Sequence, residues 1–203
     1  MTPRKLIPLV LALGLLLLGT GGCIFSPSPD PEPVPQPPPT YAAATSPEIL
    51  MQNFKAIYEN MDYDAFRDLL MDEGYKTMLQ QDTVDEFSLP QNFFTYEEEL
   101  AIQQHIFSSQ PIDGPDGPIP GVSSINFTTF EQQADWTQAP PNDPNFPNAL
   151  YATYNVRFEF MRNGGASTTL LVQGFIQFYL TTIEQNGTTL YRLIGQVDLT
   201  QGG

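Results

Sequence analysis

The fold is decided by residues 150–198, which read LYATYNVRFEFMRNGGASTTLLVQGFIQFYLTTIEQNGTTLYRLIGQVD. Apolar and polar side chains alternate along three parts of this stretch, as they do in strands that bury one face of a sheet. The even positions of 150–160 and 170–180 are apolar or glycine, and so are the odd positions of 191–197. The sequence therefore predicts three consecutive antiparallel strands whose apolar positions face a core.

The turns between these strands set which residues pair. Asn186-Gly187 is typical of a two-residue type I′ turn, which needs positive φ at both positions, so Gln185 is expected to pair with Thr188. Continued along the strands, this register places three pairs on the inner face: Leu180 with Leu193, Phe178 with Gly195, and Ile176 with Val197.

The first hairpin is expected to have a three-residue loop at 164–166, because a two-residue loop would move Gln173 to the inner face. Gly174 and Gly195 lie in mid-strand and predict a bulge or bend that curls the sheet, with simple tolerance of glycine as the alternative. The expected inner pairs are Phe160 with Leu170, Phe158 with Val172, Val156 with Gly174, and Tyr154 with Ile176.

The first 22 residues have the features of a secretion signal. Two cations precede an apolar run at 6–18, which is too short for an ordinary membrane-spanning helix, and small residues then lead to Cys23, the only cysteine. This order resembles a bacterial lipoprotein signal, which implies that residues 1–22 are removed and that Cys23 carries acyl chains such as palmitate. Thr20 departs from the leucine usual in that family. An ordinary secretory signal and an uncleaved membrane anchor are the alternatives.

Charge restricts what the chain could bind. It contains 8 Lys and Arg against 23 Asp and Glu, and Arg4 and Lys5 would leave with the signal. This balance argues against nucleic acid as a partner and against attraction to anionic lipid, so the membrane would be reached through the lipid on Cys23. In bacterial lipoproteins an aspartate after the cysteine often signals retention in the inner membrane. Ile24 therefore favours a bacterial cell-envelope protein on the outer membrane, facing the periplasm.

Residues 23–45 are expected to join the lipid to the folded domain. Within them, residues 26–40 read SPSPDPEPVPQPPPT, and this density of proline favours extended polyproline II while opposing helix and sheet. We expect a semi-rigid spacer before a single domain at 46–203. A ligand for a proline-binding module is the alternative.

Three helices are predicted before the sheet, each from its capping residues. Ser46-Pro47-Glu48 begins the first, Asp62 caps a short second helix that Gly74 closes, and the capping box Thr95–Glu98 begins the third. Their expected buried residues are Ile49, Leu50, Phe54, Ile57, Tyr58 and Met61 in the first, Phe66, Leu69 and Leu70 in the second, and Leu100, Ile106 and Phe107 in the third.

Short strands are expected at 75–79 and 122–130, and loops at 109–121 and 139–147. Helices followed by a strongly bent sheet resemble the nuclear transport factor 2-like (SnoaL-like) superfamily. This resemblance implies an α+β fold with three N-terminal helices packed on a strongly curved, cone-shaped (cystatin-like) antiparallel sheet. It rests on the helical opening, with Ser46-Pro47-Glu48, Asn53-Phe54, Ala56-Ile57-Tyr58, Asp62 to Phe66 and Leu69-Leu70, and on the last strand, Tyr191 to Asp198, in which Gln196 stands where members commonly carry a second tryptophan.

In this superfamily a pocket often opens between the helices and the sheet, and its isomerases pair a tyrosine with an aspartate. The predicted inner face of the three strands has no Asp or Glu, since Glu159 and Asp198 are expected to point outward with Arg157 and Arg192. We therefore expect neither a catalytic residue nor a cofactor, although enzymatic activity stays open. The pocket candidates are Phe54, Tyr58, Tyr154, Phe158, Phe178 and Tyr191, with an ordinary aromatic core as the alternative.

The remaining candidates for chemistry are few. His105, the only histidine, is expected on the surface of the third helix, and Asp113, Asp116 and Asp143 lie among glycine and proline, where they form turns. No metal site is expected, because a single histidine and a lipidated cysteine leave only carboxylates as ligands.

The outer sheet face mixes polar and apolar side chains, as protein interfaces do. Its apolar members, and the interface candidates, are Leu171, Phe175, Tyr179 and Ile194, unless a loop covers them. The sequence thus favours a lipid-anchored envelope domain that binds or assembles, as a homodimer or with an envelope protein, without catalysis. The alternative is a small-molecule-binding protein or an isomerase- or dehydratase-like enzyme that uses the interior of the cone.

Overall fold

The computed structural model describes residues 37–114, 117–163 and 169–199. The chain divides into residues 1–38 and a compact unit of residues 39–203, and every helix and strand of the described residues belongs to this second unit. The expected signal, Cys23, Asp116 and the loop at 164–166 lie outside the described residues.

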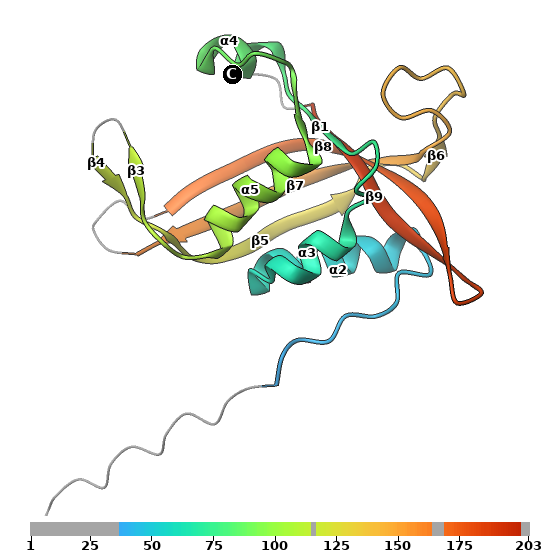
Figure 1. Ribbon diagram of the computed structural model, residues 1–203, viewed down its shortest axis with the longest axis horizontal. Helices are drawn as coiled ribbons and strands as arrows, with labels where there is room; N and C mark the ends of the chain where they lie inside the picture. Colours follow the sequence, from blue (N-terminus) through green and yellow to red (C-terminus); the bar gives the residue numbers. More distant parts are fainter. Residues whose placement is uncertain (1–36, 115–116, 164–168, 200–203) are drawn as a thin grey trace, which may run out of the picture. The chain divides into compact units, whose positions relative to one another are not determined.

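The domain is built around one curved sheet (Figure 1). Its strands follow the order β2-β1-β9-β8-β7-β5, and β6 pairs with β7. All the pairs are antiparallel except β1 with β9, which is parallel and departs from the expected antiparallel sheet. The strands are β1 Lys76–Met78, β2 Phe93–Thr95, β5 Val122–Gln132, β6 Thr137–Gln138, β7 Leu150–Arg162, β8 Thr169–Gln185 and β9 Thr188–Asp198.

The predicted helices form from the predicted caps. The side chains of Ser46, Asp62 and Thr95 accept hydrogen bonds from the third residue beyond each, and Thr95 and Glu98 complete the capping box. The second helix ends at Leu69, however, and Gly74 lies in the turn that follows, at φ 81°. The helices are α2 Pro47–Asn60, α3 Tyr63–Leu69, α4 Gln81–Phe87 and α5 Tyr96–Phe107.

Five elements were not expected from the sequence. They are α4, β2, β6, and the two strands of a separate hairpin, β3 Ile112–Gly114 and β4 Gly117–Ile119, which lies inside the segment expected to be a loop. Helix α4 buries none of its residues, and Phe87 on it is 65% exposed. Elements that contribute little to the core do not need a periodic pattern of apolar residues. Because helices and strands were predicted from that pattern, these elements were not found in the sequence.

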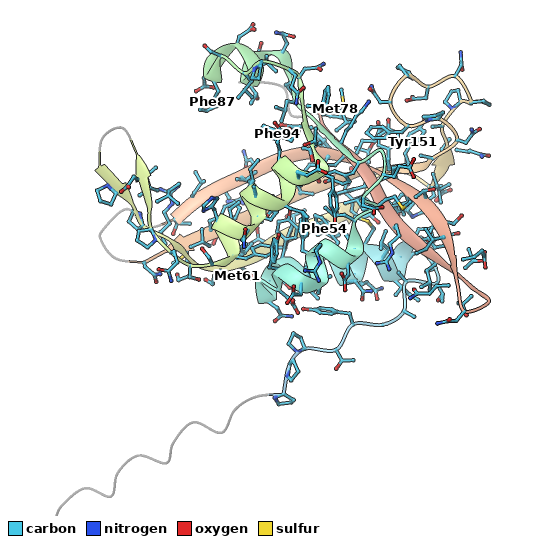
Figure 2. All side chains as sticks on the ribbon, viewed as in Figure 1. Phe54, Met61, Met78, Phe87, Phe94 and Tyr151 are labelled. Atoms are coloured by element: carbon cyan, nitrogen blue, oxygen red, sulfur yellow. The ribbon has the colours of Figure 1, made fainter. Side chains whose placement is uncertain are left out.

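Helices α2, α3 and α5 pack on one face of the sheet and bury an aromatic core between them. Phe54 is central to this core, with ring centroids 4.6 Å from Tyr58, 5.1 Å from Phe178 and 5.9 Å from Phe130. Figure 2 shows Phe54 between the helices and the sheet, whereas Phe87 lies on α4, apart from this core.

The register of the first long hairpin is confirmed. Phe160 pairs with Leu170, Phe158 with Val172, Val156 with Gly174, and Tyr154 with Ile176. Val156 is buried and Arg157 is exposed, as the assignment of faces requires. Gly174 lies in regular pairing with Val156, so no bulge interrupts the sheet there.

The register of the second hairpin is confirmed only near its turn. Gln185 pairs with Thr188 and Leu180 with Leu193, but a bulge then leaves Ile194 without a partner in β8. Beyond the bulge, Phe178 pairs with Gln196 instead of Gly195, and Ile176 pairs with Asp198 instead of Val197. Side chains alternate between the two faces of a strand, and a bulge adds one residue to one strand. In the part of β9 beyond the bulge, residues expected on the inner face therefore lie on the outer face, and the reverse.

Residues of β9 at and beyond the bulge take part in a second apolar cluster, which lies on the outer face of the sheet. The segment between β6 and β7 folds over this face and buries Phe146, whose ring stacks on Tyr179 at 4.3 Å between centroids. Val197 and Ile194 pack against the same cluster. A Cβ at Gly195 would overlap the ring of Phe146, so this position needs glycine for close packing.

Candidate ligand-binding site

A cavity of about 160 Å³ lies between helices α2 and α5 and the inner face of the sheet. Its walls are mainly aromatic and aliphatic, and two glutamine side chains interrupt them, one from α5 and one from β9. The lining residues are Phe54, Tyr58, Gln103, Phe127, Val156, Phe158, Phe160, Ile176, Phe178 and Gln196.

Hydrogen bonds fix both glutamines through a buried carboxylate. Gln196 Nε2 donates to Thr77 Oγ1 at 3.1 Å, and the Thr77 hydroxyl donates to Glu99 Oε2 at 2.8 Å. Gln103 Nε2 donates to the other oxygen, Glu99 Oε1, at 3.2 Å. The Thr77 hydroxyl can donate only one hydrogen bond, and it donates that bond to Glu99. In the hydrogen bond of 3.1 Å between the Tyr75 and Thr77 hydroxyl groups, Tyr75 is therefore the donor.

Glu99 is the ionisable centre of this network. Its side chain is 3% exposed, and burial raises its pKa, while the hydrogen bonds from Thr77 and Gln103 act in the opposite direction. Burial and then the Glu99 charge hold the pKa values of Tyr58 and Tyr75 well above the usual range for tyrosine, while the neighbouring Gln103 side chain acts in the opposite direction on Tyr58 and Thr77 does so on Tyr75. Both phenols therefore remain protonated hydrogen-bond donors.

Gln103 is left with unused hydrogen-bonding capacity. Its Oε1 atom is buried and has no hydrogen-bond partner among the described residues. A buried acceptor without a partner is costly, and such groups are commonly satisfied by a water molecule or a ligand. Because Gln103 lines the cavity, an occupant of the cavity could supply the missing donor.

The sequence interpretation missed Glu99 and Gln103. It placed Leu100, Ile106 and Phe107 on the inner side of the third helix, and the structure buries Phe107 but leaves Leu100 and Ile106 only partly buried. The buried residues follow the spacing Glu99, Gln103, Phe107, four apart, which marks one helical face. That spacing is visible in the sequence, but polar residues are assigned to the surface by default.

The sequence predicted no Asp or Glu on the inner face of the three strands, and the structure nevertheless brings carboxyl groups inward in two ways, of which only the second contradicts that prediction. Glu99 enters from α5, outside the three strands that were considered. The bulge in β9 also pairs Asp198 with Ile176, whose side chain is on the inner face, so Asp198 does not share the outward face of Arg157. Gln196 reaches the cavity through the same change of register.

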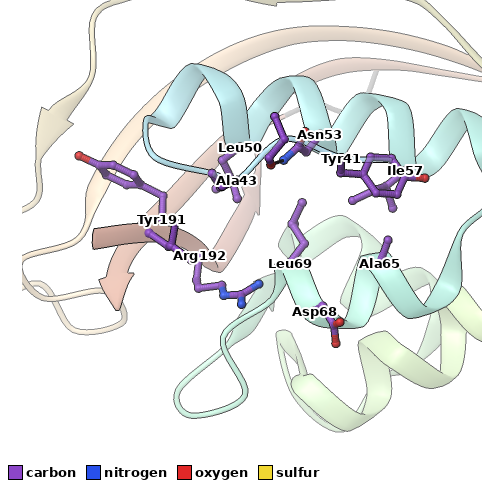
Figure 3. Close-up of a pocket in the computed structure, with 13 residues that line it drawn as sticks. Tyr41, Ala43, Leu50, Asn53, Ile57, Ala65, Asp68, Leu69, Tyr191 and Arg192 are labelled. Atoms are coloured by element: carbon purple, nitrogen blue, oxygen red, sulfur yellow. Dashed lines mark hydrogen bonds between the residues drawn. The ribbon is translucent and has the colours of Figure 1, made fainter. Parts of the chain in front are cut away.

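Four of the six pocket candidates, Phe54, Tyr58, Phe158 and Phe178, line the cavity. Tyr154 packs on Phe130 with 4.9 Å between ring centroids, and burial, followed by the charge of Glu48, raises its pKa to about 12. Tyr154 and Tyr191 do not line the cavity, and Tyr191 instead borders a different pocket (Figure 3).

The four interface candidates divide into two pairs. Tyr179 is 8% exposed beneath Phe146, and Ile194 packs into the same cluster, so the segment between β6 and β7 covers this end of the outer face. Leu171 and Phe175 are 42% and 45% exposed. Only the second pair is therefore available on the surface.

Of the other titratable candidates, His105 and Asp143 lie where the sequence predicts, whereas Asp113, expected in a turn, does not. His105 is exposed on α5, and Asp143 accepts hydrogen bonds from the backbone N–H groups of Asn145 and Phe146, as a turn former does. Asp113 lies in β3. Within the described residues, no group of three His, Cys, Asp or Glu side chains could hold a metal ion.

Replacing Glu99 with glutamine should change how stability depends on pH. The pKa of Glu99 is higher in the folded state than its unfolded-state value, near 4.5. The contribution of Glu99 to the free energy of unfolding is therefore most favourable at pH values below 4.5, and it is lost as pH rises through the folded-state pKa. We expect wild type to gain unfolding free energy relative to Glu99→Gln as pH falls from 7 to 4. Urea denaturation over this range measures the difference, and a difference that is constant with pH would contradict the raised pKa.

No family model and no curated protein sequence matches the chain. Solved structures do: a protein assigned as an aromatic ring hydroxylase from Novosphingobium aromaticivorans aligns at 9% identity and TM-score 0.46, covering 77% of this chain and 87% of that one. An NTF2-like protein of unknown function in nutrient uptake from Rhodospirillum rubrum aligns at 8% identity and TM-score 0.43, covering 77% and 99%. A protein assigned as a dehydratase of the NTF2-like family from Streptomyces avermitilis aligns at 10% identity and TM-score 0.43, covering 77% and 94%. This chain is similar to these nuclear transport factor 2-like proteins in fold alone.

Proposed function

We propose that the domain binds a small, mainly apolar molecule in the cavity between α2, α5 and the sheet. The observation that carries the proposal is the cavity itself, whose aromatic and aliphatic walls contain two oriented glutamines, Gln103 and Gln196. Ligand sites commonly combine an apolar lining with a few fixed polar groups of this kind.

The size and lining of the cavity define the class of ligand. Its volume of about 160 Å³ is close to that of engineered apolar cavities, ~150 Å³, that admit benzene. The Oε1 atom of Gln103, which lies beside the Tyr58 phenol, has no hydrogen-bond partner among the described residues and can accept a hydrogen bond from a ligand. A single aromatic ring that carries one hydroxyl group, as in phenol, meets both requirements.

Binding without catalysis is the better interpretation. Among the residues that line the cavity, only Tyr58 is ionisable, and the raised pKa of its phenol keeps it protonated, so that it cannot take up a proton from a ligand. Glu99 is already engaged by Thr77 and Gln103 and stands behind the lining. An isomerase- or dehydratase-like activity would need a base at the ligand, and the described lining offers none.

Comparing phenol with toluene, which lacks the hydroxyl group, should distinguish the contribution of the Gln103 hydrogen bond from that of the apolar walls. Gln103→Leu should weaken phenol binding about tenfold, because one hydrogen bond contributes roughly 1–1.5 kcal/mol, and should leave toluene binding unchanged or tighter. Val156→Phe should fill the cavity and abolish binding of both compounds, whereas Ile183→Phe, which adds a ring to β8 outside the lining, should not. Calorimetric titration measures all three, and binding that survives Val156→Phe would contradict the site.

We also propose that the domain is held on a bacterial envelope membrane by a lipid on Cys23. This part of the proposal is supported by the sequence of residues 1–40 alone. Among the described residues, none of the helices is both long enough and apolar enough to cross a membrane.

Cys23→Ser should remove the acylation site and move the protein from the membrane fraction to the soluble fraction of cells. Metabolic labelling with palmitate should mark wild type and not the variant. Full retention of Cys23→Ser in membranes would rule out the lipid anchor.

A second candidate function, assembly, is favoured by exposed apolar side chains on the outer face. Leu171 and Phe175 are 42% and 45% exposed, and Phe175 borders a hollow that Arg157 and Gln173 also line. Apolar side chains mixed with arginine and glutamine are typical of interfaces that assemble reversibly. We propose a second copy of this chain, or another envelope protein, as the partner.

Phe175→Ser should weaken self-association measured in a sedimentation concentration series. Phe87→Ser, which also removes an exposed phenylalanine but lies on α4, is the matched control and should behave as wild type. A wild-type chain that is monomeric at every concentration and crosslinks to no envelope protein would contradict assembly through this face.

A further inference from the structure

The edge of β9 opposite β8 is covered by three separate segments. Tyr191 N donates to Ala44 O at 2.8 Å, and Met71 N donates to Leu193 O at 2.8 Å. Strand β1 pairs with β9 from Gly195 onward. Such cover removes the exposed backbone groups through which edge strands associate.

A pocket of about 250 Å³ opens at Arg192, between the first two of these segments. Its apolar side is formed by Leu50 and Ile57 of α2 and Leu69 of α3, and residues 41–44 also line it. Figure 3 shows the Arg192 side chain extending from β9 toward α3, where Leu69 and Asp68 lie. This pocket shares no lining residue with the cavity that contains Gln103.

Hydrogen bonds hold the wall formed by residues 41–44 in place. Asn53 Nδ2 donates to Ala42 O at 2.7 Å, and the Tyr41 hydroxyl donates to Asp62 Oδ2 at 3.1 Å. With the bond from Tyr191 to Ala44, three anchors fix four residues. The pocket is therefore formed before any ligand enters.

The pocket presents charges of both signs that do not neutralise each other. Arg192 makes no hydrogen bond or ion pair with its side chain in the described part of the chain, and no ion pair joins it to Asp68, which lines the same pocket. Asp68 contacts Arg67 at 3.4 Å, at the surface. Asn53 uses its Nδ2 group for Ala42 and retains Oδ1 as an acceptor.

We propose that this pocket binds a free α-amino acid with an apolar side chain, such as leucine. Arg192 would receive the carboxylate, since a guanidinium recognises carboxylates by paired, charge-assisted hydrogen bonds. Asp68 would receive the ammonium group, and Leu50, Ile57 and Leu69 the side chain. A volume of about 250 Å³ is below the ~300–1,000 Å³ of drug-sized sites and suits a ligand of this size.

The test is calorimetric titration of the full-length chain with L-leucine and two analogues that each remove one charge. Leucine methyl ester lacks the carboxylate, and 4-methylpentanoate lacks the ammonium group. We expect leucine to bind saturably and both analogues to bind at least tenfold more weakly. Arg192→Gln should weaken leucine binding at least tenfold, and Arg192→Lys should restore part of it.

Controls separate this site from the rest of the protein. Arg157→Gln removes an arginine of the outer face and should leave leucine binding unchanged, as should Val156→Phe, which fills the other cavity. Asp68→Asn should weaken leucine and not 4-methylpentanoate. Absence of leucine binding at millimolar concentration, unchanged binding by Arg192→Gln, or equal binding of 4-methylpentanoate would each overturn the proposal, whatever the result with phenol.

Discussion

The bulge at Ile194 is the constraint on which the rest of the structure depends. One residue without a partner in β8 exchanges the faces of β9 between Leu193 and Gln196. Leu193 remains in the core beneath the helices, while Gly195 turns outward and makes room for the ring of Phe146. Without the extra residue, Val197 would face the helices, and Gln196 would face the segment that carries Phe146.

The buried carboxylate of Glu99 depends on this exchange. A charge or a polar group without partners in an apolar core costs several kcal/mol, so polar residues that are retained there usually form hydrogen bonds with one another. Gln196 Nε2 donates to Thr77, and Thr77 in turn donates to Glu99, which connects β9, β1 and α5. This chain of hydrogen bonds orients the polar groups around a cavity that is otherwise apolar, and the outcome is a site suited to binding.

The sequence predicted most of the fold because the signals that specify it are local. Alternation gave the register of β7 with β8, and the capping residues Ser46, Asp62 and Thr95 gave the starts of three helices. The bulge could not be placed in this way. A glycine in mid-strand marks a position where a bulge is possible, but the sequence offered Gly174 and Gly195 alike. The structure pairs Gly174 regularly and packs Phe146 against Gly195, next to the bulge, and this tertiary contact is not visible in the local pattern.

The candidate site was predicted less well than the fold, for a related reason. Its aromatic walls at Phe54, Tyr58, Phe158 and Phe178 follow from apolar periodicity. Its polar groups do not, because Gln196 reaches the cavity only after the change of register, and Glu99 and Gln103 are buried against their usual preference. The covered half of the outer face likewise depends on Phe146, whose segment has no periodic pattern to indicate where it packs.

Nuclear Overhauser contacts between bound phenol and the labelled protein test the bulge and the binding site together. If the bulge turns Gln196 inward, the phenol ring should make contacts with the side-chain amide protons of Gln196 and with the rings of Phe54 and Phe178. Contacts from phenol to the methyl groups of Val197, with none to Gln196, would show that β9 keeps an unbroken register and would contradict both the bulge and the binding site built on it.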